Sequence, residues 1–99
     1  MCTYIIQKAD LIGSSAKGPA GWFPLASANV AFDHPFHAQF DHALLIDFVN
    51  PDSPSGRVAV EMSASSARAL IKAIEAALEE GAKAGVDQED LVEHTVISL

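Results

Sequence analysis

Residues 42–62, HALLIDFVNPDSPSGRVAVEM, decide the fold. Residues 42–49 are nearly all apolar, and residues 57–62 alternate Val58, Val60 and Met62 with smaller or charged side chains. Both patterns are typical of β-strands. Two prolines and a glycine lie between them and deny the backbone regular ladder bonds, so residues 50–56 are expected to form a turn or loop. The stretch therefore predicts two strands joined by a short connection.

Two further strands are predicted on the N-terminal side of this stretch. Residues 4–12 and 22–32 are rich in branched and aromatic side chains, as strands are. Residues 13–21, GSSAKGPAG, separate them and form a concentrated turn signal. We expect a hairpin or a wide loop there, within a meander of about four antiparallel strands.

An amphipathic helix is predicted on the C-terminal side, over about residues 64–80. Apolar residues recur there at helical spacing, and charged residues occupy the other side. Ser63 or Ser65 is expected to be the N-cap, and Gly81 or Gly85 to end the helix in a left-handed conformation. The apolar positions are Ala67, Leu70, Ile71, Ile74, Ala77 and Leu78.

These elements predict an α+β fold in which about four antiparallel strands, in a meander, pack on one long amphipathic helix. A chain of 99 residues with 49% hydrophobic residues is expected to form a single domain over residues 1–99. The tail, residues 86–99, fits either a short helix or a strand. Because one helix covers only one face of a sheet, we expect a homodimer or a ligand cavity over the other face, with the tail as the alternative cover.

The net negative charge of the chain limits the kinds of partner that it can bind. Thirteen acidic and six basic residues give a formal charge of −7, which repels phosphate backbones, so no nucleic acid partner is expected. No stretch approaches the roughly 20 apolar residues of a membrane span, and the first residues lack the pattern of a signal peptide. We therefore expect no membrane association and a cytoplasmic location. The single cysteine, Cys2, agrees with a reducing compartment.

The candidate site is residues 33–42, DHPFHAQFDH, which hold three of the four histidines. Imidazole and carboxylate are common ligands of transition metals, zinc in the first place. Pro35 disfavours a helix, so a tight loop is expected to gather the rings around one ion. The predicted metal ligands are His34, His37 and His42. The carboxylates that would complete the shell or orient a ring are Asp33, Asp41 or Asp47.

Other interpretations of these residues stay open. The histidines would carry protons without a metal, or they would pack against Phe36 and Phe40 in a structural role. Cys2 would become the amino-terminal residue on removal of Met1, and its amine and thiol would then chelate an ion or act as a nucleophile. An inert cysteine is the alternative.

Asp47 and Glu61 are the predicted catalytic residues. If the two strands of residues 42–62 pair, both carboxylates fall on one face of the sheet, with Arg57 near them. Two carboxylates in a half-apolar setting can divide the roles of acid and base. A cross-strand salt bridge on a solvated face is the alternative.

Four segments of the chain resemble a family of small actinobacterial proteins whose function is uncharacterised. They are MCTY at 1–4, KGPAGWF at 17–23, DHPFHA at 33–38 and IDF at 46–48. The resemblance covers about the first eighty residues, and it implies no activity.

The residues support three functions. The first is a small metal-binding protein, extending to a metal-dependent enzyme of small-molecule metabolism. The second is a non-catalytic dimeric module that binds a ligand or a partner chain. Its pocket would be lined by Leu45, Val49, Trp22 and Phe23. The third is a metal-free acid/base isomerase or cyclase, which needs Asp47 and Glu61 to face one cavity.

Overall fold

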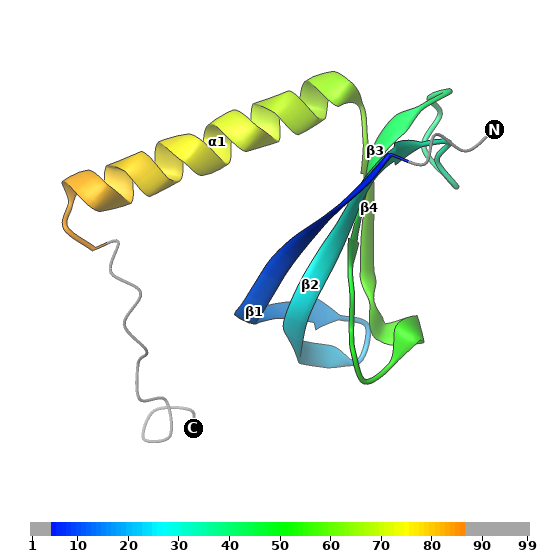
Figure 1. The fold of residues 1–99 in the computed structure, drawn as a ribbon, viewed down its shortest axis with the longest axis horizontal. Coiled ribbons are helices and arrows are strands. Elements are labelled where there is room, and N and C mark those ends of the chain that lie inside the picture. Colours follow the sequence, from blue (N-terminus) through cyan, green and yellow to red (C-terminus); the bar gives the residue numbers. More distant parts are fainter. Residues whose placement is uncertain (1–4, 87–99) are drawn as a thin grey trace. The chain divides into compact units, whose positions relative to one another are not determined.

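The computed structural model describes residues 5–86 (Figure 1). In chain order its elements are β1 (Ile6–Gly18), β2 (Gly21–Asp33), β3 (Ala43–Phe48), the 3-10 helix η1 (Pro54–Gly56), β4 (Val58–Met62) and α1 (Ala64–Lys83). The strands form one antiparallel sheet in the order β1-β2-β3-β4. The predicted α+β fold, with four antiparallel strands in a meander and one helix, is therefore confirmed. From residue 87 on, the expected tail helix or strand lies outside the described residues.

β1 and β2 are joined as a hairpin, which is the first of the two connections expected from the sequence. Both strands are longer than the sequence suggests. Pairing continues to Gly18 opposite Gly21, so Pro19 and Ala20 alone form the turn. The register shifts once, in the segment that contains Gly13, whose φ is 92°. A side chain with a Cβ is strained at that angle, and glycine is not. The glycine and serine residues expected in a wide loop are mostly strand residues.

Well-buried side chains lie near the end of this hairpin. Phe23 is 8% exposed and Leu25 is 7% exposed, and because they are two residues apart in β2 they point to the same face. A Cβ on Gly18 would lie 2.5 Å from the backbone oxygen of Gly56 and 3.2 Å from the Phe23 ring. The hairpin and the β3–β4 connection therefore approach so closely that position 18 has room only for glycine.

One face of the sheet carries both predicted catalytic carboxylates. Leu45 pairs with Glu61, and the next pair on the same face joins Asp47 to Ala59. Because side chains alternate along a strand, Asp47 and Glu61 point to the same side as diagonal neighbours. The row that contains Glu61 runs across all four strands through Leu45, Ala31 and Ile6.

Helix α1 has the predicted start and end. The Ser66 backbone N–H donates a hydrogen bond to Ser63 Oγ at 3.1 Å, so Ser63 is the N-cap. The helix ends at Lys83, and Gly85 follows with a φ of 74°, as expected for a left-handed terminator. The sheet and the first turn of α1 belong to one compact unit, and a second unit begins at Ala69. Within residues 5–86, no helix has the length and apolar character needed to cross a membrane.

Candidate functional site

Residues 34–42 form the loop that joins β2 to β3. These strands are neighbours in the sheet, and the last residue of β2, Asp33, pairs with the first residue of β3, Ala43. The two ends of the loop therefore leave the sheet side by side. His34 begins the loop and His42 ends it, so the strand pairing itself brings these two histidines together.

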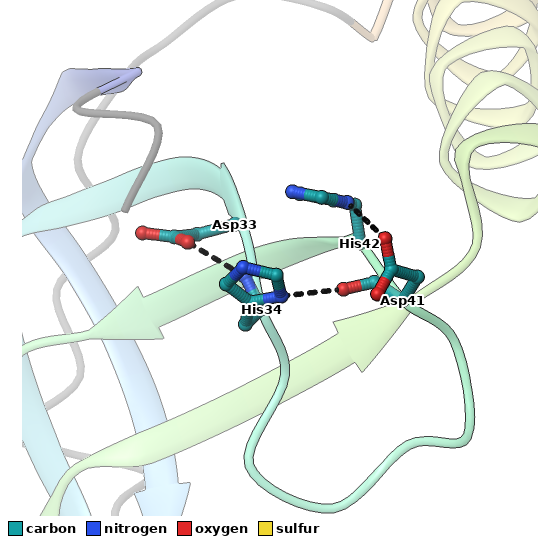
Figure 2. A network of polar contacts seen from close by, with 4 residues as sticks. All are labelled: Asp33, His34, Asp41 and His42. Atoms are coloured by element: carbon teal, nitrogen blue, oxygen red, sulfur yellow. Dashed lines mark hydrogen bonds and ion pairs between the residues drawn. The ribbon is translucent and has the colours of Figure 1, made fainter. Parts of the chain in front are cut away.

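His34, Asp41 and His42 form a compact group (Figure 2). Each offers one nitrogen or carboxylate oxygen, and these atoms all lie within 4.8 Å of one another. The two ring centroids are 4.4 Å apart, and the His42 ring also stacks on Phe32 at 6.0 Å. His34 and Asp41 are exposed while His42 is half-buried. The group therefore has a solvent-facing side, backed by an aromatic ring.

Asp41 contacts both histidines and determines which ring nitrogen of each carries a proton. Its backbone oxygen lies 2.8 Å from His34 Nδ1, and its carboxylate Oδ2 lies 3.0 Å from His42 Nδ1. A carbonyl oxygen and an ionised carboxylate can only accept, so each Nδ1 must donate. In a neutral imidazole the lone pair is then on Nε2. In Figure 2 the second nitrogen of each ring points away from Asp41, an arrangement that metal-ligating histidines commonly show.

His37, the third predicted ligand, is outside this group. Its backbone N–H donates to Glu61 Oε1 at 3.0 Å. The N–H groups on either side do the same: Phe36 donates to Oε2 at 2.6 Å and Ala38 to Oε1 at 2.7 Å. The Glu61 carboxylate therefore accepts three consecutive backbone N–H groups from the middle of the loop.

These bonds change the acidity of Glu61. The N–H groups of Ala38 and Phe36, in that order, stabilise the ionised carboxylate and hold the pKa of Glu61 below its ordinary value of 4.5. Partial burial acts in the opposite direction and is outweighed. The sequence prediction missed this contact, because it depends on the path of the loop over the sheet and no local pattern encodes that path.

Asp47 and Glu61 line one hollow of about 410 Å³ on their face of the sheet. Arg57 also lines it and donates from its guanidinium to Asp47 Oδ1 at 3.0 Å. The expected salt bridge is therefore present, and both carboxylates face the same cavity. Their role in proton transfer stays a prediction.

The hollow differs from the pocket expected for a binding module. Leu45 is part of its lining, but Val49, Trp22 and Phe23 are not. Trp22 is 72% exposed, and Phe23 is buried. The floor of the hollow is instead built from the apolar row that crosses the sheet, including Ile6 and Ala31.

The remaining candidates are Asp33, the two phenylalanines of the loop and Cys2. Asp33 Oδ1 accepts the His34 backbone N–H at 2.7 Å and so helps to start the loop. Phe36 is 96% exposed and Phe40 is 50% exposed, and the aromatic partner of His42 is Phe32. Cys2 lies outside the described residues.

Searches for related proteins give a family and nothing further. No curated protein and no solved structure matches the chain. One protein family does, over residues 1–88, and that range includes the four strands, the histidine loop and α1. The chain therefore belongs to DUF6295, a family of unknown function.

Proposed function

We propose that this protein binds a divalent transition metal, zinc in the first place, through the loop between β2 and β3. The proposed ligands are one ring nitrogen each of His34 and His42 and a carboxylate oxygen of Asp41. The convergence of these groups within 4.8 Å carries the proposal. Asp41 already contacts both rings, and zinc takes imidazole nitrogen and carboxylate oxygen in tetrahedral sites.

Three protein ligands leave one position of a tetrahedral ion open. Water or a small molecule reaches that position easily, because His34 and Asp41 are exposed. Zinc sites with an open position are characteristic of catalysis, in which the ion activates a bound water or polarises a substrate. The proposal therefore extends to a metal-dependent enzyme of small-molecule metabolism.

A zinc titration of tag-free protein tests the proposal. We expect one zinc ion per chain, and an affinity that falls by more than about 100-fold in His34→Ala and in His42→Ala, beyond the loss typical of an outer-shell partner. His37→Ala is the matched control, because it removes the same side chain from the same loop outside the group. It is expected to bind zinc like the wild type. No zinc binding by the wild type, or equal loss in all three variants, would overturn the proposal.

A second candidate function is the binding of a small molecule in the hollow. Its volume of about 410 Å³ lies in the range of small-molecule sites, about 300–1,000 Å³, and it combines an apolar floor with charged groups. Asp47 and Glu61 would there contact a ligand, or act as the acid and base of a metal-free isomerase or cyclase. Thermal stabilisation by a ligand that persists in chelator and is lost in Ala59→Phe, which fills the hollow, would support this candidate.

A further inference from the structure

We infer that Glu61 is a positioning residue that holds residues 34–42 in the metal-binding shape. The same carboxylate lines the hollow on the sheet, so it connects the hollow to the metal site. The inference rests on the proposed function and adds to it a residue that does not touch the ion.

The loop reaches Glu61 by crossing a strand. It joins β2 to β3, whereas Glu61 belongs to β4 on the far side of β3. The middle of the loop must therefore lie over β3 for Phe36, His37 and Ala38 to donate to this carboxylate. Hydrogen bonds to an ionised acceptor are shorter and roughly twice as strong as neutral ones, so the three bonds hold the loop firmly.

The shape that Glu61 holds is not a regular one. Residues 36–42 are bends that belong to no helix or strand. Successive N–H groups in a turn can point at one anion, and the Glu61 carboxylate is the anion that these three N–H groups bind. His34 and Asp41 lie on either side of the three donors, so the turn sets the separation between these two proposed ligands.

Because Glu61 lines the hollow, a ligand bound there would affect the contact between Glu61 and the loop. A molecule in the hollow lies against Glu61, Asp47 and Arg57. A ligand that draws the Glu61 carboxylate away from the loop weakens metal binding, and a bound metal ion strengthens the contact between Glu61 and the loop. By thermodynamic linkage, a bound metal ion weakens the binding of that ligand by the same factor.

Glu61→Gln tests the inference, with Asp47→Asn as the matched control. Both substitutions remove one negative charge from the same hollow, but Asp47 contacts Arg57 and Glu61 contacts the loop. An amide keeps one acceptor oxygen and places an N–H₂ group against the backbone donors. We expect the zinc affinity of Glu61→Gln to fall by about 10- to 100-fold, as for other outer-shell partners, and that of Asp47→Asn to stay at the wild-type value.

Two further readouts separate positioning from a loss of stability. At saturating Co²⁺, the visible spectrum of Glu61→Gln is expected to differ from that of the wild type, whereas a variant that is only less stable would keep it. In the wild type, zinc is expected to slow amide exchange at Phe36, His37 and Ala38. This second measurement needs no variant, so it applies even if Glu61→Gln fails to fold.

The outcomes distinguish the inference from the function on which it rests. Absence of zinc binding by the wild type overturns both. Normal zinc binding by the wild type together with an unchanged affinity in Glu61→Gln overturns the positioning role alone. Unchanged amide exchange at Phe36, His37 and Ala38 on addition of zinc also overturns the positioning role alone. So does a loss of zinc affinity in Asp47→Asn that equals the loss in Glu61→Gln.

Discussion

Asp41 binds the two neighbouring histidines with two different kinds of oxygen. The backbone carbonyl holds His34, and the carboxylate holds His42. A substitution removes the second contact and leaves the first, so the two histidines respond differently to a change at one position.

Asp41→Ala is therefore expected to release His42 and spare His34. Nitrogen NMR of the rings should show His34 still protonated at Nδ1, because its backbone acceptor remains. The His42 ring should become a mixture of tautomers. Zinc affinity should fall by more than about 100-fold, as in the two histidine variants, since the Asp41 carboxylate is one of the proposed ligands. Identical changes at both rings would contradict this account of Asp41.

Among the glycines, Gly18 has the least room for a side chain. A Cβ there would lie 2.5 Å from the Gly56 backbone oxygen, and a backbone atom cannot rotate away. We expect Gly18→Ala to lower the free energy of unfolding by about 1–3 kcal/mol, the usual cost of overpacking. Gly81→Ala is the control, because nothing lies within 4 Å of its added Cβ and its helical position favours alanine by about 0.5–1 kcal/mol. Chemical denaturation measures both, and a neutral Gly18→Ala would contradict the close approach.

The sequence predicted part of the site for identifiable reasons. His34 and His42 meet because they flank two paired strands, and strand ends are visible in the apolar pattern. The hydrogen bonds of His37 and Glu61 were not foreseeable. They depend on how a loop folds over a sheet, which is decided by contacts between residues 23 to 25 positions apart.

At the scale of elements, the loop between β2 and β3 carries a pH dependence. The pKa of Glu61 is below its ordinary value of 4.5 in the folded protein. The ionised form therefore stabilises the folded loop, fully above pH 4.5, and this contribution is lost as the pH falls below 4.5 through the folded-state pKa. Acid thus acts on the loop through the carboxylate that binds it.

We expect the amide protection of Phe36, His37 and Ala38 to be constant above pH 4.5 and to fall at lower pH, in the range where Glu61 becomes protonated. Hydrogen exchange followed by NMR, corrected for the intrinsic rate, measures this. Glu61→Gln should show no such step. A step of the same size in that variant would mean that another group causes the change.

The sequence predicted the bounds of some elements better than those of others. Periodicity defined β3, β4 and α1, and the Ser63 cap fixed the start of the helix. The extension of β1 through residues 13–18 was not expected, because glycine, alanine and lysine have low strand propensity. Pairing with the part of β2 that carries Phe23 and Leu25 overrides that propensity, as tertiary context often does.

At the scale of the whole molecule, the homodimer stays a prediction. The chain has 99 residues, of which 49% are hydrophobic, and a chain of this length buries only a modest share of its surface by itself. Sedimentation analysis of the full chain should give about twice the single-chain mass of 10.4 kDa. A mass close to 10.4 kDa at all concentrations would contradict the dimer. The proposed metal site would stand, because its three residues lie on one chain.

The most direct test of the metal site is a long-range ¹H–¹⁵N NMR experiment on the histidine rings, recorded as zinc is added to tag-free protein. We expect one ring nitrogen resonance of His34 and one of His42 to shift together and to saturate at one zinc ion per chain. The His37 ring should be unaffected. Ring nitrogen resonances of His34 and His42 that do not respond to zinc, or a response centred on His37, would contradict the proposed site.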